Sequence, residues 1–446
     1  MPGLADWLDR NDTLSAPPPV WQQRLGGGPQ SVTIAGNAAI VEHRTSVESR
    51  SLASGVQLWQ RKVDWAAVAG GASDPVVVVG KLLVKGYEVV DPQSGAVRRR
   101  DSSAVAVWTY RNGLLDARCF EPKDCVLTAW DPRGGSPLWT VELPGVGVAL
   151  VADNPELLGT RRMGTRRVDA RAGGPEQMPA LLGFPVDGRV LVVDTATGRL
   201  LQQIQPDRQE RVVVVGGRVL RINAKADDGT CYFSVRADDP ANDQQVWQKD
   251  GINLRTADGA GCIQRKDPQG GNNMIVGVGP DRREAVIDAY DGRYLWVGVP
   301  DENLLAVDDR YALVRSADHR SVLGYELARS PARWSRPADP DGGAVLARYA
   351  AIVTGEEPDR IVALDPLTGG ELANLRSSAK VLAVGPRGMI IGEGREIGYV
   401  PFGAVAAVGV EPAPGADSVP DGGPGVAPSC SGPKLEVCPP DEPKDG

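Results

Sequence analysis

The chain has 446 residues, with 57 acidic against 49 basic side chains and a formal net charge of −8. An acidic balance of this size excludes a broadly cationic nucleic-acid binder. Gly and Pro number 54 and 36, and this density of turn formers favours many short β-strands over long helices.

The net charge is concentrated at the two ends of the chain. Residues 404–446 hold seven acidic side chains against two lysines, and the first 20 residues hold three aspartates against one arginine. The central part is therefore close to neutral, and we expect no bias of sign that would steer a charged macromolecule to it.

Nothing in the sequence predicts a membrane-spanning helix. Apolar runs such as Val76–Val79 and Val212–Val215 have four residues, far fewer than the roughly 20 that a spanning helix needs. Residues 1–19 have neither the basic region nor the apolar core of a secretory signal. We expect either a cytosolic protein or one whose targeting segment is absent from this chain.

After an extension over 1–19, residues 19–22 are typical of the last strand of a unit whose first three strands are missing. Three strand-like segments at the other end, 380–385, 388–394 and 396–402, lack a fourth. We predict that the two ends of the chain complete one sheet together.

Between these ends the sequence repeats. The mark of the repeat is an acidic residue, a Gly four positions later and a Trp four positions after that. It is complete at Asp131, Gly135 and Trp139, and again at Asp288, Gly292 and Trp296. Partial marks stand at Ser51/Gly55/Trp59, Asp91/Gly95, Asp194/Gly198, Asp239/Trp247, Glu326/Trp334 and Asp365/Gly369. A period near 40 residues indicates one supersecondary unit used many times.

Each unit is expected to hold four short strands. In one of them these are 104–110, 113–119, 125–131 and 137–143, separated by turns rich in Gly and Pro. One such sheet cannot bury both of its faces, but a ring of sheets can, which is the β-propeller arrangement. In the turn before the fourth strand, the acid would accept hydrogen bonds from backbone amides and the Gly would supply a positive φ, while the Trp would cover the seam between blades.

The sequence therefore predicts an all-β protein, an eight-bladed β-propeller of four-stranded antiparallel blades, closed by the N- and C-terminal strands. Eight repeat marks, together with the blade shared by the two ends, would give nine blades if each were counted. We predict eight because the mark around Asp239 is weak and 145–190 contains an insertion. The propeller would cover 20–403, with a protruding inserted loop at about 153–180. Residues 404–446 would form a Pro/Gly-rich acidic tail.

Six cysteines form three pairs that are local in sequence, and we interpret them as disulfide candidates: Cys119 with Cys125, Cys231 with Cys262, and Cys430 with Cys438 in the tail. Six unrelated reduced thiols are the alternative. No CxxC occurs, and both histidines lie far from any cysteine, which argues against a metal site. The pairs favour an oxidising compartment, whereas reduced cysteines would place the protein in the cytoplasm.

The segments VLVVDTATGRLL (190–201) and IVALDPLTGGEL (361–372) resemble the repeats of the PQQ-type β-propeller family. The resemblance covers roughly 20–403 and is similar in style to the non-catalytic, BamB-like members and to extracytoplasmic propeller domains of membrane proteins. It implies a propeller fold and says little about function, because one fold serves many functions.

Dehydrogenases of this family bind pyrroloquinoline quinone and Ca²⁺, and they typically place adjacent cysteines over the cofactor. This chain has no Cys-Cys dipeptide and no CxxCH haem motif. We therefore expect no enzyme activity, no cofactor, no metal and no catalytic residue. A Ser377–Lys380 SxxK match and the glycines at 392–394 lack the accompanying motif or helix that their chemistry needs.

One motif suggests a binding site. Two arginine pairs stand on the inserted loop: Arg161, Arg162, Arg166 and Arg167. Guanidinium pairs suit carboxylate or phosphate partners, although a solvated loop is the simpler interpretation.

From these features we predict an extracytoplasmic, non-enzymatic scaffold that binds a protein or cell-envelope component through its propeller faces. We expect no nucleic-acid partner, and membrane association only through a segment absent from this chain. The alternatives are a quinone- and calcium-dependent oxidoreductase, or the small-ligand-sensing ectodomain of a membrane signalling protein.

Overall fold

The computed structural model describes residues 13–403 apart from 83, 121–123, 134, 146–169, 208–209, 228–229, 255–256, 259–262, 265–272, 330 and 357. It describes the backbone alone at 170–171, 225–227, 230–232, 257–258 and 263–264. The chain divides into two compact units, Met1–Val408 and Gly409–Gly446, and the described residues lie in the first.

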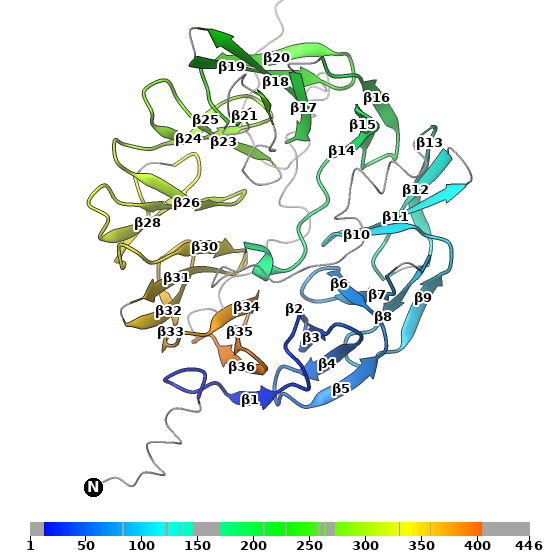
Figure 1. Ribbon diagram of the computed structural model, residues 1–446, viewed down its shortest axis with the longest axis vertical. Coiled ribbons are helices and arrows are strands. Elements are labelled where there is room, and N and C mark those ends of the chain that lie inside the picture. Colours follow the sequence, from blue (N-terminus) through cyan, green and yellow to red (C-terminus); the bar gives the residue numbers. More distant parts are fainter. Residues whose placement is uncertain are drawn as a thin grey trace, which may run out of the picture. The chain divides into compact units, whose positions relative to one another are not determined.

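Short strands rich in Val, Ala, Leu and Ile form a series of antiparallel sheets round a common centre (Figure 1). Blade 1 consists of β2 (Ser31–Ala35), β3 (Ala38–Glu42), β4 (Val47–Ser51) and β5 (Gln57–Arg61). Blade 2 consists of β6 (Trp65–Ala69), β7 (Val76–Gly80), β8 (Tyr87–Val90) and β9 (Val97–Asp101). Blade 3 consists of β10 (Ala106–Thr109), β11 (Leu114–Phe120), β12 (Asp124–Trp130) and β13 (Pro137–Leu143).

The next three blades are less regular. A 3-10 helix, η3 (Ala170–Gly173), precedes blade 4, which has three strands, β14 (Leu181–Val186), β15 (Arg189–Asp194) and β16 (Leu200–Ile204). Blade 5 consists of β17 (Glu210–Val215), β18 (Arg218–Asp227), β19 (Thr230–Asp239) and β20 (Gln244–Asp250). A small hairpin, β21 (Ala257–Asp258) and β22 (Ile263–Gln264), precedes blade 6, which consists of β23 (Met274–Val278), β24 (Glu284–Asp288) and β25 (Tyr294–Val297). In blade 6, Asn253 adds a bridge to Val278 at the free edge of β23.

Three four-stranded blades complete the series. Blade 7 consists of β26 (Asn303–Val307), β27 (Tyr311–Arg315), β28 (Ser321–Glu326) and β29 (Trp334–Pro337). Blade 8 consists of β30 (Ala344–Ala347), β31 (Ala350–Glu356), β32 (Asp359–Leu364) and β33 (Glu371–Arg376). Blade 9 consists of β34 (Lys380–Gly385), β35 (Gly388–Glu393), β36 (Glu396–Pro401) and β1 (Trp21–Arg24).

The propeller has nine blades, so the prediction of eight is wrong. The weak mark around Asp239 belongs to a complete four-stranded blade, and its Trp247 is buried and donates to the Ala289 carbonyl of blade 6. The predicted closure is present, because β1 pairs antiparallel with β36 from Trp21↔Tyr399 to Arg24↔Glu396. One sheet thus joins the two ends of the propeller.

Five blade seams repeat one tryptophan contact. Trp59 of blade 1 donates its Nε1 hydrogen to the carbonyl of Pro92 in blade 2 at 3.0 Å. Its ring lies against Gly95, where an added Cβ would stand 2.9 Å from the indole. The same donation, at 2.6–3.0 Å, joins Trp21 to Leu52, Trp139 to Thr195, Trp247 to Ala289 and Trp334 to Pro366. The Asp and Gly of the repeat therefore position the turn on which the preceding blade docks.

The seam between blades 2 and 3 is different, because Arg99 occupies the tryptophan position of blade 2. The Arg99 guanidinium stacks on the Trp130 ring of blade 3, 3.9 Å from its centroid. Asp116, fully buried on β11, accepts hydrogen bonds from the Tyr87 hydroxyl at 2.6 Å and from Trp130 Nε1 at 2.8 Å. Arg118 pairs with Asp101 at 2.7 Å and lies 3.7 Å from Asp116.

Burial controls the electrostatics of this polar seam. Desolvation raises the pKa of the Asp116 carboxyl, although Tyr87 and Arg118 act in the opposite direction. Desolvation also lowers the pKa of the Arg99 guanidinium. Three buried atoms in the seam have no hydrogen-bond partner among the described residues: Arg99 Nη1, Asp116 Oδ1 and Arg118 Nε. The charges are thus buried without complete compensation.

Candidate binding surface

The order of the strands decides which strand of each blade faces the centre of the ring and which turns lie on each face of the propeller. The first strands of neighbouring blades contact one another, as in β2·β34, β2·β6 and β26·β30, so they face the centre of the ring. Because the strands are antiparallel, the turns between the first and second strands lie on the same face as those between the third and fourth. We call this the Asp-turn face. The other, which carries the second-to-third turns and the links between blades, is the link face.

The Asp-turn face is made rigid by its aspartates. In blade 2, Asp91 accepts hydrogen bonds from the backbone amides of Gln93 and Ser94, at 3.0 and 2.9 Å. The amide bond from Ser94, with Arg98 and the Ser94 hydroxyl, holds the pKa of the Asp91 carboxyl at about 2. Asp194, Asp288 and Asp365 make the same kind of turn, as expected from the sequence.

A segment of the insertion, Ala172–Ala180, crosses the centre of the ring on the Asp-turn face. At its start, η3 packs on β30 and β34, and Ala172 is buried in the core cluster that holds Ala347 and Ala350. Gly173 lies so close that an added Cβ would stand 3.0 Å from the Arg348 amide nitrogen. In Figure 1, η3 lies beside β30 and the chain continues from it to β14.

The far end of this crossing segment is fixed to blades 3 and 4. The Arg111 amide donates to the Glu176 carbonyl at 2.7 Å, and the Met178 amide donates to Asn112 Oδ1 at 2.8 Å. The Thr195 hydroxyl donates to the Pro179 carbonyl at 2.6 Å. Blades 8 and 3 stand four places apart in one direction round a ring of nine and five in the other. The chain therefore bridges nearly opposite blades.

This finding corrects one expectation and leaves another untested. A protruding loop is wrong for residues 172–180, since Ala172 and Met178 are buried against the propeller. The remainder of the predicted loop, 153–169, lies outside the described residues, and with it the candidate Arg161, Arg162, Arg166 and Arg167. No periodic pattern in the sequence marks the crossing, because its contacts are with blades distant along the chain.

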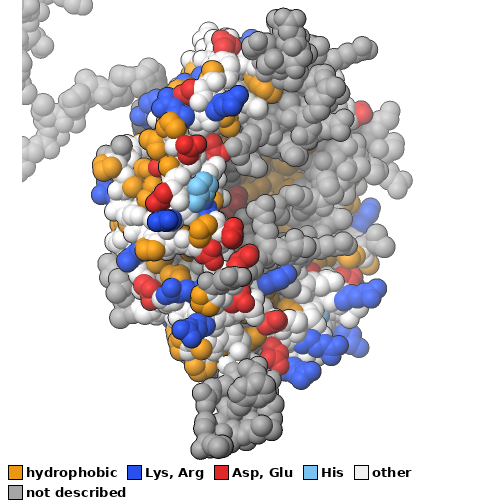
Figure 2. All heavy atoms as spheres, turned by 60° about the vertical axis from the view of Figure 1, so that its left-hand side comes forward, with side chains coloured by type: hydrophobic (Ala, Val, Ile, Leu, Met, Phe, Trp, Pro, Cys, Tyr) orange, Lys and Arg blue, Asp and Glu red, His pale blue; other side chains and the backbone are white. Residues whose placement is uncertain are grey.

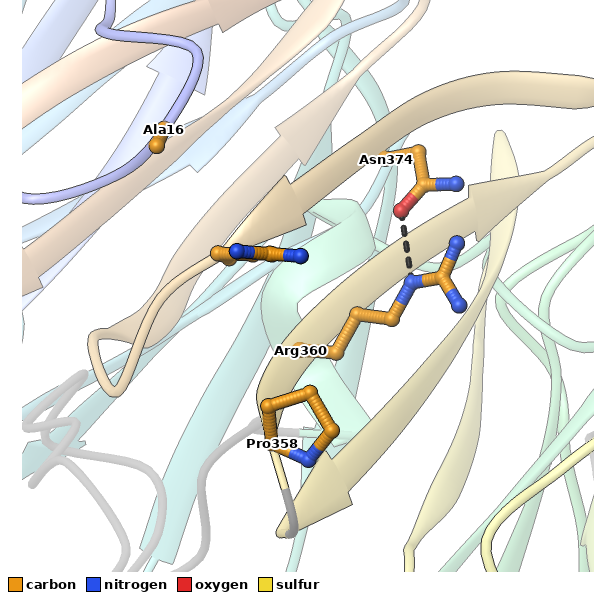
Figure 3. A pocket seen from close by; sticks show the side chains of 5 residues that line it. Ala16, Pro358, Arg360 and Asn374 are labelled. Carbon is orange, nitrogen blue, oxygen red and sulfur yellow. Dashed lines mark hydrogen bonds between the residues drawn. The ribbon is translucent and has the colours of Figure 1, made fainter.

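A second feature is a cavity of ≈ 480 Å³ at the outer edge of blade 8, near the link face. It is lined by Ala16, Pro358, Arg360, Asn374 and Arg376. Ala16 reaches it because the N-terminal segment pairs with the free edge of β33, exchanging two backbone hydrogen bonds of 3.0 Å with Arg376. Figure 3 shows the Arg360 guanidinium turned toward Asn374. Arg360 Nε donates to Asn374 Oδ1 at 2.7 Å.

Surface charge elsewhere is mixed. Figure 2, which brings the side with β23–β33 forward, shows Lys and Arg side chains interspersed with Asp and Glu. Exposed arginines on these blades form short ion pairs, such as Arg333 with Glu326 and Arg283 with Asp281. No large area of one sign is visible on this side, in line with the near-neutral central part of the sequence.

The described side chains do not fit a quinone and calcium centre. They contain no group of three His, Cys, Asp or Glu residues that could hold a metal ion. Five tryptophans of the repeat position donate to neighbouring blades, so these five are engaged at the seams: Trp21, Trp59, Trp139, Trp247 and Trp334. The Cys119–Cys125 disulfide joins β11 to β12 at the link face, and its cysteines are six positions apart.

That disulfide confirms one predicted pair. The side chains of Cys231, Cys262, Cys430 and Cys438 lie outside the described part of the chain, so their pairing stays a prediction. Ser377 donates its hydroxyl to the Leu14 carbonyl and accepts from the Ala379 amide at 3.0 Å, which is a structural role. No described helix is long and apolar enough to cross a membrane.

Sequence reasoning missed the residues at the polar seam and at the cavity. A signal existed for the seam, because Arg99 stands where the repeat places a tryptophan. The cavity residues carried no such signal, since Arg360 and Arg376 become neighbours only through the register of β32 and β33. Ala16 joins them from the other end of the chain.

Comparisons with known proteins give a likeness of fold. No family model matches the chain, and no curated protein matches it. Among solved structures it is similar to BamB from Moraxella catarrhalis at 14% identity, over 81% of this chain and 97% of that one, with a TM-score of 0.33. It is also similar to the quinohemoprotein alcohol dehydrogenase ADHIIG from Pseudomonas putida HK5, at 12% identity over 84% and 72%, with a TM-score of 0.36.

A further similar structure, Hsv2 from Kluyveromyces lactis, has 10% identity over 70% of this chain and 99% of that one, with a TM-score of 0.33. These three matches all have TM-scores below 0.5 and do not decide whether this chain is an enzyme.

Proposed function

We propose that the protein is a non-enzymatic binding scaffold that works outside the cytoplasm and holds a protein or cell-envelope partner on its faces. The observation that carries this proposal is the crossing segment. It is fixed at Ala172 against blade 8 and at Met178 against blade 3, so the chain itself bridges the centre of the ring on the Asp-turn face. The turns and links round that centre are then the parts that can receive a partner.

Rigid presentation supports the same proposal. At five seams a tryptophan fixes one blade to the next through a hydrogen bond of 2.6–3.0 Å, and aspartates such as Asp91 hold the turns that receive it. A rigid frame loses little conformational entropy when a partner binds. Binding residues carried on loops above such a frame are a common arrangement.

Export is supported by the Cys119–Cys125 disulfide, because disulfides persist in oxidising compartments and are rare in the cytosol. A thiol titration of protein from its native host, under native and denaturing conditions, tests this part. No free thiol is expected. Six free thiols would indicate a cytoplasmic protein and contradict export.

The binding proposal is tested by photocrosslinking in the native host. A photoreactive amino acid is placed at exposed apolar positions. Val56 and Leu367 lie in turns of the Asp-turn face, Leu82 and Val299 lie on the link face, and Leu138 on the outer strand β13 is the control. We expect a discrete crosslinked product from one face and none from Leu138. Equal products from all positions, or none from any, would contradict a face-directed partner.

A thermal shift assay with pyrroloquinoline quinone and Ca²⁺ separates this function from an oxidoreductase. A ligand that binds only the folded state raises stability by about 2.7 kcal/mol at a hundredfold excess over its Kd. We expect no shift in melting temperature with the pair, or with either alone. A saturable shift would favour the enzyme.

A further inference from the structure

Two arginines stand directly opposite one another at the cavity of blade 8. Arg360 on β32 is the cross-strand partner of Arg376 on β33, so their side chains start about 5 Å apart on one face. Like charges in this position destabilise a sheet. Neither guanidinium has a carboxylate within ion-pair distance in the described part of the chain.

The same row of the sheet has a small residue on each side of the pair. Beyond Arg376 the row continues to Ala16, and beyond Arg360 it continues to Gly355. Ala16 lines the cavity, whereas an added Cβ at Gly355 would already contact Pro358 and Asp339. Asn374 fixes one arginine by accepting from Arg360 Nε, and this leaves the terminal nitrogens of that guanidinium available. Both arginines are exposed.

Blade 5 places carboxylates of the chain itself beside such a pair, although Arg236 Nε stays without a partner among the described residues. Arg221 on β18 is the cross-strand partner of Arg236 on β19, the other directly opposed arginine pair among the described strands. Both donate to one oxygen, Asp238 Oδ2, at 2.9 and 2.8 Å, and Asp238 is fully buried. Asp238 lies two positions from Arg236. In blade 8 the residue two positions from Arg376 on the cavity side is Asn374, a neutral amide.

We infer that Arg360 and Arg376 form a binding site for a carboxylate side chain of a protein partner, taking the place that Asp238 holds in blade 5. A guanidinium fork matches a carboxylate with two parallel hydrogen bonds. The cavity of ≈ 480 Å³ has room for more than one carboxylate, so an acidic peptide segment fits better than a small free acid. This inference rests on the proposed function and names the chemistry of the partner.

The site is tested by fluorescence anisotropy with a labelled oligoglutamate peptide and the full chain. We expect R360Q/R376Q to weaken binding about tenfold or more, and each single change about threefold to tenfold. R376K keeps the charge and loses the fork, so its affinity should lie between those of the wild type and R376Q. R199Q, at an exposed arginine on blade 4 away from the cavity, is the matched control and should bind as the wild type does.

N374D is the sharpest variant, because it supplies an internal carboxylate of the same size beside Arg360. We expect it to weaken peptide binding about as much as the double change. No rise in melting temperature is expected, because N374D also loses the hydrogen bond that Asn374 Nδ2 donates to Glu371 Oε2 at 2.9 Å. R360Q/R376Q should melt no lower than the wild type, since it removes a like-charge pair. The inference is overturned by unchanged binding in R360Q/R376Q, or by an equal loss in R199Q.

Competition identifies the ligand class, and crosslinking separates the two proposals. Glutarate should displace the peptide at lower concentration than inorganic phosphate. The reverse order would overturn the assignment of a carboxylate. If the photocrosslinked partner persists unchanged in R360Q/R376Q, the scaffold function stands and this inference fails. Loss of the crosslink in that variant, with R199Q unaffected, supports both.

Discussion

Two seams of the propeller join neighbouring blades by different chemistry. Between blades 5 and 6, Trp247 lies buried against Gly292 and donates to the Ala289 carbonyl at 3.0 Å. Between blades 2 and 3, Arg99 occupies the equivalent position beside a buried Asp116. The first seam gains from apolar burial with every polar atom of the indole satisfied. At the second seam the desolvation of charged groups costs free energy, and buried polar atoms have no partner among the described residues. The repeat therefore sets the position of a seam contact without fixing its chemistry.

The largest effect should come from removing a tryptophan. Trp247→Ala deletes a buried ring and its hydrogen bond, so we expect a loss of about 3–5 kcal/mol in the free energy of unfolding. Urea denaturation followed by far-UV circular dichroism measures it. Leu138→Ala, at a side chain that is 57% exposed, should change stability by less than about 0.5 kcal/mol. Similar losses in the two variants would contradict the role of the seam.

The two glycines of one repeat position sharpen the comparison. Gly369 has a φ of 66°, and an added Cβ would stand 2.6 Å from Trp334 Cγ, so Gly369→Ala should cost about 2–3 kcal/mol. Gly135 holds the equivalent place at the arginine seam, where nothing lies within 4 Å of an added Cβ. Gly135→Ala should be neutral within about 0.5 kcal/mol in the same assay. A large loss there would show that the two seams pack alike.

The smallest effect concerns pH. The pKa of Asp116 is raised in the folded state above its unfolded value near 3.8, so the folded protein holds this proton more tightly. Its contribution to stability is then greatest below the unfolded pKa and declines as pH rises through the raised value. Asp116→Asn should remove that slope while changing stability by about 1 kcal/mol or less at neutral pH. Urea midpoints of both proteins between pH 4 and 7 measure it.

Asp91 supplies the opposite slope as a control. Its folded pKa of about 2 lies below the unfolded value, so its stabilising effect is present above about pH 4 and declines as pH falls toward 2. Asp91→Asn should flatten the curve only in that acid range. If Asp116→Asn kept the wild-type slope between pH 4 and 7, the buried carboxyl would be ionised throughout, and the two seams would respond alike to pH.

Repetition made most of the fold predictable from the sequence. The strands 113–119 and 125–131 correspond to β11 and β12 within one residue at each end, and the shared blade was predicted from both ends of the chain. The predicted number of blades was wrong because the repeat motif around Asp239 is incomplete, although Trp247 makes the same seam contact as the other tryptophans. Local patterns predict local units well. They carry less information about how many units close a ring.

The candidate site was harder to predict, for a physical reason. The crossing segment is held by Ala347, Asn112 and Thr195, which belong to three different blades, so no local pattern of residues specifies it. The arginine pair depends on a register between strands, and a shift of one residue would separate Arg360 from Arg376. Such features arise from tertiary geometry, which periodicity does not encode.

The mixed blade 9 has a consequence for the order in which the chain can fold during synthesis. Its outer strand β1 is synthesised before the other described strands, and its partner β36 is synthesised after them. Trp21 can therefore pair with Tyr399 only once all of these strands have been made. Until then β1 has no sheet to join, and blade 1 lacks the Trp21 contact at Leu52. Ring closure must therefore be a late event in the folding of the propeller, because it needs every strand from β1 to β36.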